Sequence, residues 1–197
     1  MALTAIFGGT FNPLHIGHYK MLEALQNNPN ISEILIMPDK IPPHKVCDVM
    51  AKDSLRIEMC KITAADFSKA KVCLIEFERE GKSYSYDTVI NLKSSFPDKE
   101  FVFVCGADML VTFDLWYNYD KLMKELPFIV FKRGDIPQEE FNSALSRFRK
   151  MGMEILVDET VIPCVSSTAI RCDIKNSKRL LTDEVYNLLS ESGAYLA

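Results

Sequence analysis

The chain has 197 residues, with 27 acidic side chains against 23 basic ones and a formal net charge of −4. This balance argues against a general nucleic-acid-binding protein, which needs an excess of Lys and Arg to displace the counterions of the phosphates. The longest apolar runs, residues 101–105 and 128–131, are far shorter than the roughly 18–20 residues of a membrane span. The first residues lack a basic region followed by a long apolar stretch, so we expect no signal peptide, no membrane contact and a cytoplasmic protein.

Six cysteines are spread along the chain without a C-x-x-C pair. In the absence of secretory signals we expect their thiols to be reduced. Cys73 and Cys105 stand within or beside apolar, strand-like runs, where a thiol behaves as a small hydrophobic group. We therefore assign no cysteine to the functional site.

Short apolar runs alternate along the chain with longer segments of helical periodicity. The expected strands are residues 3–7, 34–37, 72–77, 101–105, 128–131 and 155–157. The expected helices are residues 16–26, 54–65, 86–96, 115–125 and 138–151, with Gly152 ending the last of these and Thr182 capping a further helix near the C-terminus.

This alternation predicts an α/β protein with a doubly wound parallel sheet. Most of the expected strands are nearly continuous apolar runs, as is typical when helices cover both faces of a sheet. At about 100–200 residues per domain, the length predicts a single domain over residues 1–197. Because ligands of such sheets bind at the carboxyl ends of the strands, the loops after the strands are the candidate site.

The motif GGTFNPLHIGH, residues 8–18, follows the first expected strand and opens the first helix. Its paired glycines allow the backbone to approach a ligand closely, and N–H groups at a helix start favour an anion such as phosphate. His15 and His18 are three residues apart, so their rings project from nearly one face of the helix. Two capping or core histidines are the alternative, and a zinc site is disfavoured because no Cys or third His stands nearby at ligand spacing.

This motif resembles the G-G-x-F-x-P-x-H-x-G-H signature of the nucleotidyltransferase superfamily that is related in fold to the class I aminoacyl-tRNA synthetases. The superfamily usually has Asp where this chain has Asn12, and we expect Asn12 mainly to turn the backbone before Pro13.

A later segment, VSSTAIR at residues 165–171, resembles the I-S-S-T-x-I-R element of the same superfamily. Ser166 or Ser167 can cap a helix there, while the Thr168 hydroxyl and Arg171 can meet phosphate oxygens. Read alone, this segment is more often a helix cap than a site, and its pairing with the first motif favours a site.

Three middle segments are similar to bacterial nicotinate mononucleotide adenylyltransferases: PDKIPPHK at residues 38–45, SYSYDTV at residues 83–89, and residues 106–116. His44 and Lys45 follow two prolines that stiffen the loop and would hold a cation over an anionic substrate. Trp116 offers a flat surface on which a pyridine ring can stack, with a core role as the alternative. Asp108 can accept hydrogen bonds from a ribose, or alternatively serve as a charge at a helix N-terminus.

The resemblance covers residues 3 to about 195 and implies a Rossmann-like nucleotidyltransferase fold with a small C-terminal helical part from about residue 166. It implies transfer of the adenylyl group of ATP to nicotinate mononucleotide, with Mg²⁺ bound mainly through the ATP phosphates and no protein metal site. The expected catalytic residues are His15, His18 and Arg171. The expected ATP- and phosphate-binding residues are Gly8, Gly9, Thr10, Phe11, Gly106, Asp108, Ser166, Ser167 and Thr168. The expected mononucleotide-binding residues are His44, Lys45, Tyr86, Thr88, Trp116 and Tyr117.

The resemblance also implies that backbone N–H groups near Thr88, Trp116 and Tyr117 meet the nicotinate carboxylate. We interpret Arg56, Arg79 and Arg133 as surface or ion-pair residues. A sibling adenylyltransferase that uses nicotinamide mononucleotide or phosphopantetheine, and a non-catalytic dinucleotide-binding module, stay as alternatives. An oxidoreductase is disfavoured because the first turn lacks G-x-G-x-x-G, and a synthetase by the length of the chain and its missing second signature. A homo-oligomer is left open.

Overall fold

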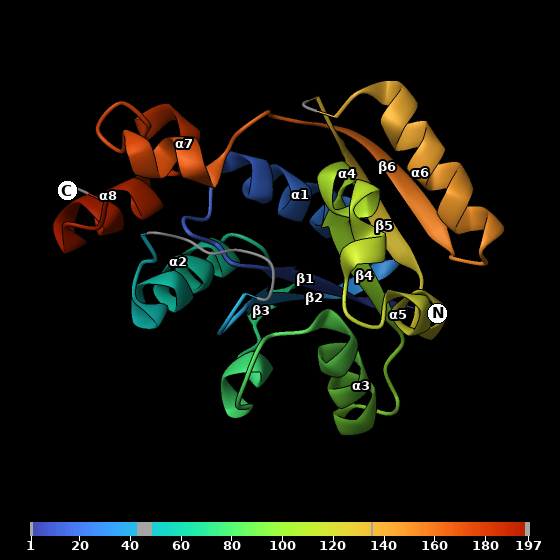
Figure 1. Cartoon of the computed structure of the whole chain (residues 1–197). Coiled ribbons are helices and arrows are strands. Elements are labelled where there is room, and N and C mark those ends of the chain that lie inside the picture. The colour runs from blue at the N-terminus through green and yellow to red at the C-terminus, as the bar shows by residue number, and fades with distance from the viewer. Residues whose placement is uncertain (1, 43–48, 135, 196–197) are drawn as a thin grey trace.

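A parallel sheet forms the centre of the protein in a computed structural model that describes residues 2–42, 49–134 and 136–195 (Figure 1). Its strands are β1 (Leu3–Gly9), β2 (Ile31–Pro38), β3 (Ala70–Val72), β4 (Phe101–Gly106), β5 (Phe128–Arg133) and β6 (Ile155–Ile162). They pair in the order β3-β2-β1-β4-β5-β6, and every pair is parallel. The chain extends the sheet outward from β1 on one side and from β4 on the other, which confirms the predicted doubly wound α/β fold.

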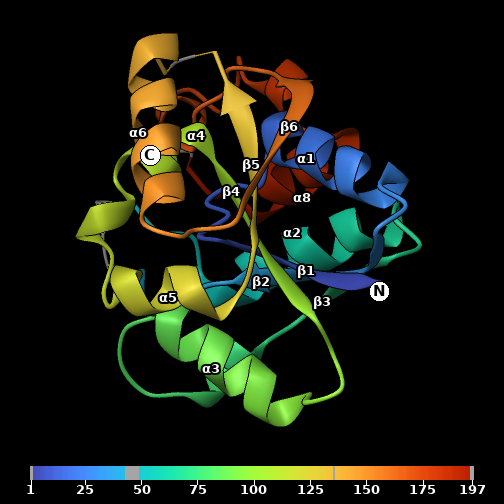
Figure 2. The same cartoon turned by 90° about the vertical axis from the view of Figure 1, so that its right-hand side faces the viewer.

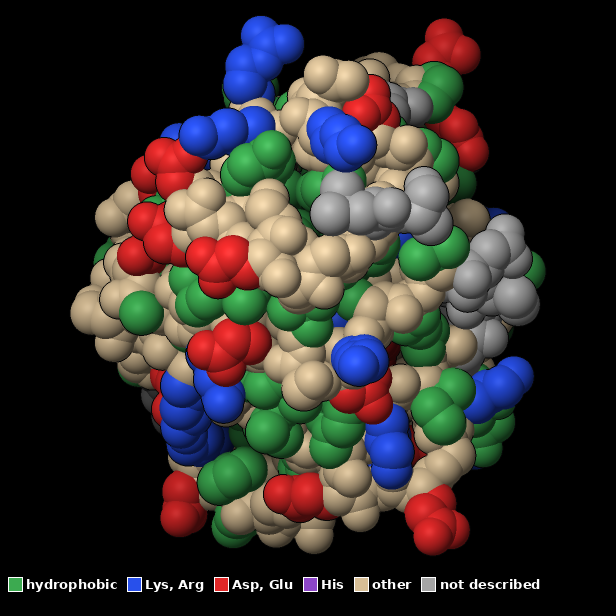
Figure 3. Space-filling view, turned by 90° about the vertical axis from the view of Figure 1, so that its left-hand side faces the viewer, with side chains coloured by type: hydrophobic (Ala, Val, Ile, Leu, Met, Phe, Trp, Pro, Cys, Tyr) green, Lys and Arg blue, Asp and Glu red, His purple; other side chains and the backbone are tan. Residues whose placement is uncertain are grey.

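Helices cover both faces of the sheet (Figures 1 and 2). They are α1 (Ile16–Asn27), α2 (Asp53–Ala65), α3 (Ser85–Ser95), α4 (Ala107–Val111), α5 (Tyr119–Glu125), α6 (Gln138–Lys150), α7 (Ser167–Cys172) and α8 (Asp183–Ser192). Among the helices that the structure describes, none is long and apolar enough to cross a membrane. On the face seen in Figure 3, basic and acidic side chains are interspersed, so this face has no broad patch of one sign.

Two hydrophobic clusters fill the space between the sheet and its helices. Successive side chains of a strand point to opposite faces, so β1 contributes to both clusters. Ala5 and Phe7 belong to the cluster covered by α1, α2, α7 and α8. Ile6, between them, belongs to the cluster covered by α3, α4, α5 and α6.

The expected strand 72–77 is wrong for most of its length. Strand β3 ends at Val72, and Ile75–Glu78 forms a 3-10 turn instead. This turn buries both Ile75 and Glu76, and the carboxylate of Glu76 accepts a hydrogen bond from the Thr88 hydroxyl. Because β3 is an edge strand paired only with β2, a tertiary contact of this kind can draw the chain out of the sheet.

The expected helix 115–125 is also wrong in its first half. The short helix α4 is followed by a 3-10 turn at Phe113–Leu115, and α5 begins only at Tyr119. Asn118 separates them with a left-handed backbone (φ 52°), a conformation that Asn tolerates better than most residues. Trp116 and Tyr117 lie in this interruption, between the 3-10 turn and α5.

Two predicted helix boundaries are confirmed. Gly152 follows the end of α6 with φ 92°, in the left-handed region that favours glycine. The hydroxyl of Thr182 caps α8 by accepting a hydrogen bond from Val185 N at 3.4 Å.

Helix α8 packs into the cluster shared with β1 and β4. Val185 and Leu189 are fully buried there, together with Ala5 and Val104. The C-terminal helical part therefore has no separate hydrophobic core among the described residues.

We predict that Leu189→Ala lowers the free energy of unfolding by about 2–5 kcal/mol, the usual cost of a cavity at a buried leucine. The chain should still unfold in one transition, because α8 shares its core with the sheet. Urea unfolding followed by both circular dichroism and Trp116 fluorescence measures this, with the exposed Asn187→Ala on the same helix as control. Separate transitions by the two probes would contradict the single domain expected from the sequence.

Candidate active site

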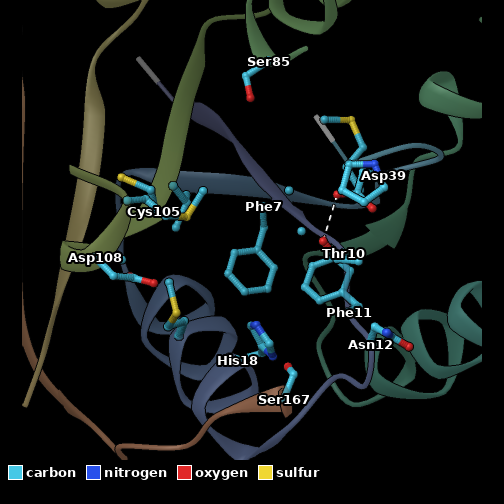
Figure 4. A pocket seen from close by; sticks show the side chains of 18 of the residues that line it. Phe7, Thr10, Phe11, Asn12, His18, Asp39, Ser85, Cys105, Asp108 and Ser167 are labelled. Atoms are coloured by element: carbon cyan, nitrogen blue, oxygen red, sulfur yellow. Dashed lines mark hydrogen bonds between the residues drawn. The ribbon is translucent and has the colours of Figure 1, made fainter. Parts of the chain in front are cut away.

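A cavity of about 860 Å³ opens at the carboxyl ends of β1 and β4, where the direction of winding reverses (Figure 4). Ligands of open α/β sheets bind at such a switch point. The cavity is lined by most of the site residues that were expected from the sequence. They are Gly8, Gly9, Thr10, Phe11, His15, His18, Thr88, Gly106, Asp108, Trp116, Tyr117, Ser166, Ser167, Thr168 and Arg171.

Three of the expected residues are not among them. Tyr86 is absent from the described lining of the cavity, because its ring packs against the cluster under α3 with Lys121 Nζ 5.9 Å from the ring centroid. The structure does not place Tyr86 at the cavity, whereas its neighbours Tyr84 and Ser85 line it. His44 and Lys45 lie outside the described residues.

The two histidines cap helix α1 reciprocally. His15 Nδ1 accepts hydrogen bonds from Gly17 N at 3.1 Å and His18 N at 3.4 Å. His18 Nδ1 in turn accepts one from His15 N at 3.2 Å. This is the arrangement of a capping box, with imidazole rings in place of the usual Ser and Glu. The two histidines therefore do cap the helix, as the alternative interpretation predicted, and both also line the cavity.

Capping also determines which ring nitrogen carries the proton. Because Nδ1 of each ring accepts a backbone hydrogen bond, the neutral ring must carry its proton on Nε2. The two rings are stacked with their centroids 3.8 Å apart. Both histidines can therefore act as Nε2–H donors from one wall.

Glycine at position 17 avoids crowding in this packing. A Cβ there would lie 3.0 Å from ring atoms of His15, a distance that real Cβ atoms rarely show. Gly9 has a similar role, since a Cβ there would lie 3.0 Å from the ring of Phe11. Phe11 has φ 46° and presents its ring edge-on to His18, with centroids 5.2 Å apart.

The two signature segments are joined by hydrogen bonds although about 150 residues separate them. Ser167 Oγ donates to Pro13 O at 3.1 Å, across 154 positions of sequence. Arg171 donates from Nη1 to Asn12 O at 2.7 Å and from Nη2 to Thr168 Oγ1 at 3.0 Å. Of the two serines that were expected to cap a helix, Ser166 caps α7, because its Oγ accepts a hydrogen bond from Ala169 N at 3.5 Å. These contacts hold the guanidinium of Arg171 beside the first loop.

The side chain of Asn12 joins three segments, which the sequence did not reveal. Its Oδ1 accepts hydrogen bonds from Ala51 N at 3.0 Å and from the Tyr195 hydroxyl, and its Nδ2 donates to Val49 O at 3.0 Å. Aspartate, usual in the superfamily, could accept the first two bonds but could not donate to Val49 O. Asn12 thus does more than turn the backbone.

Arg56 is buried and ion-paired, so its expected role as an ion-pair residue is confirmed and the alternative of a surface position is wrong. Its side chain is fully covered and donates from Nη1 to Thr10 O at 2.9 Å and to Asp39 O at 2.8 Å. Its Nη2 forms an ion pair with Asp53 at 2.6 Å. Arg56 therefore fixes the turn after β1 from behind. Its helical spacing with the buried Met59, Cys60 and Thr63 is the signal that could have revealed its burial.

The other end of the cavity is aromatic and polar. Trp116 packs against Phe113 and Phe103, with ring centroids 5.4 and 6.0 Å apart, so it belongs both to the core and to the cavity wall. Tyr117 is 48% exposed, and its ring lies 4.5 Å from that of Tyr84. In Figure 4, Ser85 lies at the end of the cavity opposite Ser167. The two ends of the cavity thus differ in the side chains that they present.

Backbone donors at this end differ from those expected. The N–H of Thr88 donates to Tyr84 O at 3.1 Å and that of Trp116 donates to Phe113 O at 3.0 Å, so both are already used. Within the described chain no side chain caps α3, and its first turn begins at Ser85 on the cavity wall. The first-turn N–H groups of α3 are the available donors for an anion here.

Cys105 also lines the cavity, although we expected no cysteine there. Burial raises the pKa of its thiol far above the usual range. The thiol stays protonated and cannot serve as a nucleophile.

The described residues contain no group of three or more His, Cys, Asp or Glu side chains that could hold a metal ion. A cation at this site would need most of its ligands from phosphates and water, the usual environment of Mg²⁺.

Comparison with known proteins gives consistent matches. The family model described as cytidylyltransferase-like matches residues 6–173. The nicotinate-nucleotide adenylyltransferase of Bacillus subtilis is 35% identical over 198 residues, covering 99% of each chain. A protein of Bacillus licheniformis named a probable nicotinate-nucleotide adenylyltransferase is 37% identical with the same coverage. The fold is similar to that of Plasmodium falciparum nicotinic acid mononucleotide adenylyltransferase complexed with NaAD (TM-score 0.80, 23% identity, covering 99% of this chain and 98% of that one).

We predict that Arg56→Met lowers the free energy of unfolding by about 3–5 kcal/mol, because it leaves the carbonyl oxygens of Thr10 and Asp39 and the carboxylate of Asp53 without their buried donor. Arg147 is a matched control, since it pairs with Asp114 at 3.0 Å on the exposed surface. Arg147→Met should cost less than about 1 kcal/mol. Chemical denaturation of both variants measures the difference, and equal losses would contradict the role given to Arg56.

Proposed function

Because the chain belongs to the cytidylyltransferase-like family and, within it, to the nicotinate-nucleotide adenylyltransferases, we propose that the cavity residues named above carry out that reaction. The protein transfers the adenylyl group of ATP to nicotinate mononucleotide, giving nicotinate adenine dinucleotide and pyrophosphate. The observation that supports this site most strongly is the reciprocal cap of His15 and His18 beside Arg171.

The chemistry is an in-line substitution at phosphorus. An oxygen of the mononucleotide phosphate attacks the α-phosphorus of ATP, and the bond from that phosphorus to the oxygen bridging the β-phosphate breaks. The leaving group is pyrophosphate. The nucleophile is already an anion, so no general base is required, and positioning and charge stabilisation account for catalysis.

In this proposal the histidines act as donors rather than as bases. Their Nε2–H groups donate to α- and β-phosphate oxygens, on which negative charge develops as the bridging bond breaks. Arg171 and the segment Ser166–Thr168 bind the outer phosphates, while Gly8 and Gly9 admit the nucleotide close to the backbone. When bound through the phosphates, Mg²⁺ would neutralise part of their charge.

Nicotinate mononucleotide occupies the other end of the cavity in this proposal. Trp116 stacks on the pyridine ring, and the uncapped first turn of α3 meets the carboxylate together with the backbone at Tyr117. Thr88, buried at the start of α3, keeps that turn in place.

The direct test is to follow pyrophosphate release with ATP, Mg²⁺ and each of three phosphate substrates. Nicotinate mononucleotide should be turned over, with nicotinamide mononucleotide and phosphopantetheine much slower. Preferred turnover of either of the other two would favour a sibling activity. Tight binding of the dinucleotide without turnover would favour the non-catalytic module.

We predict that His18→Ala and His15→Ala each lower kcat by ~10²–10³, the usual cost of losing a donor to a developing charge. The Kd for ATP should change much less. Because both rings also cap α1, circular dichroism of each variant is the control for folding. Near-full turnover at saturating substrates would contradict the role of that histidine.

Trp116→Ala should raise the KM for the mononucleotide more than the KM for ATP. Loss of stacking on an aromatic ring costs about 1–3 kcal/mol in comparable base–aromatic contacts. Steady-state kinetics with each substrate varied in turn measures the two constants. Since Trp116 also packs against Phe113, a partly unfolded variant, or equal rises in both constants, would favour a purely structural role.

We also expect kcat/KM for nicotinate mononucleotide to exceed that for nicotinamide mononucleotide at least about tenfold. An amide NH₂ facing backbone donors would leave buried groups unpaired, at ~1–3 kcal/mol. Tyr117→Phe should reduce this ratio only modestly, because the proposed donors are main-chain groups. Equal use of the two substrates by the unmodified protein would contradict the proposed carboxylate site.

A further inference from the structure

A carboxylate forms part of the cavity wall at the end proposed for nicotinate. Glu76 is 6% exposed and lines the cavity near Thr88 and Ser85. Its carboxylate accepts a hydrogen bond from the Thr88 hydroxyl. A buried negative charge at this position would repel a substrate carboxylate, and the repulsion would be stronger than in water.

Arg79 lies behind this carboxylate. Its Nη2 is 3.4 Å from Glu76 Oε2 and donates to Thr88 Oγ1 at 3.1 Å. Arg79 is not among the described residues that line the cavity, so its guanidinium acts from the far side of the wall. Its backbone is also held, since Lys40 Nζ donates to Arg79 O at 2.9 Å.

The three side chains form a closed arrangement. Thr88 donates its hydroxyl proton to Glu76 and accepts from Arg79, while Arg79 also pairs with Glu76. The 3-10 turn at Ile75–Glu78 brings Glu76 and Arg79 close together beside the first turn of α3. The negative charge of Glu76 and the positive charge of Arg79 therefore offset each other next to the proposed carboxylate site.

We propose that Arg79 is a specificity-determining residue, which maintains the preference for an acidic over an amide pyridine ring by neutralising Glu76. This rests on the proposed function of the cavity. Arg79 does not touch the substrate in this proposal. It acts through the electrostatic potential at the wall, which a charged carboxylate senses and a neutral amide does not.

The test is the ratio of kcat/KM for nicotinate mononucleotide to kcat/KM for nicotinamide mononucleotide, measured at the same pH for every variant. Arg79→Met keeps the length of the side chain without its charge, and should lower the ratio about tenfold, mainly through the acidic substrate. Glu76→Gln should raise the ratio, because the cation is then left unbalanced. The double variant should return it close to the unmodified value.

Opposite changes in the two single variants, cancelled in the double variant, distinguish an electrostatic role from a structural one. A merely structural role would lower both kcat/KM values in all three variants. Lys93→Met is the matched control, since Lys93 pairs with Glu125 at 2.7 Å on the outer part of α3 and lies outside the described cavity lining. It should leave the ratio unchanged.

An unchanged ratio in Arg79→Met, or a fall in Glu76→Gln, would overturn the proposal. Should Arg79→Met fail to fold, the Glu76→Gln result decides alone, with a rise supporting the proposal and any other result overturning it. If the unmodified protein releases pyrophosphate with neither mononucleotide, it is the proposed function that fails.

Discussion

The reciprocal hydrogen bonds between the His15 and His18 rings and the start of α1 are the constraint on which the site depends. A helix start has backbone N–H groups that need acceptors, and the two Nδ1 atoms supply them. The same bonds orient the rings and define their neutral tautomer. The hydrogen bonds that cap α1 are therefore the same ones that orient the two rings.

The neighbouring features serve this constraint. Gly17 leaves room for the His15 ring, and Phe11 packs edge-on against His18. The turn between them and β1 is held from behind by Arg56 through Thr10 O. The segment Ser166–Arg171 is attached to the first loop, because Arg171 donates a hydrogen bond to Asn12 O. The cavity wall is thus assembled from segments far apart in sequence, which is how a topological switch point concentrates function.

The sequence predicted the elements whose signals are local. The strands that flank the site, the helix that His15 opens and the cap at Thr182 all follow from periodicity and capping chemistry. The turn that follows β3, by contrast, carries a contact between Glu76 and Thr88 that no local pattern shows. The same holds for Asn12 and Tyr195, which are 183 positions apart.

The errors within the site have a similar cause. Tyr86 belongs to the motif SYSYDTV, but the direction of its side chain depends on where α3 starts, and the helix turns it toward Lys121. The ion pairing of Arg56 was expected but its burial was not, because a charged residue is rarely buried unless paired and its partners Asp39 and Thr10 O come from other segments. Residue types at a site can thus be inferred from motifs, whereas their orientation requires the tertiary contacts.

The most direct measurement of the central claim is a long-range ¹H–¹⁵N correlation spectrum of the histidine side chains at alkaline pH. The chain has only three histidines, so single substitutions assign the signals. The reciprocal cap predicts that His15 and His18 are both Nε2–H tautomers when neutral. An Nδ1–H tautomer at either position would contradict the account, because that ring could not cap α1 and present its Nε2 as a donor.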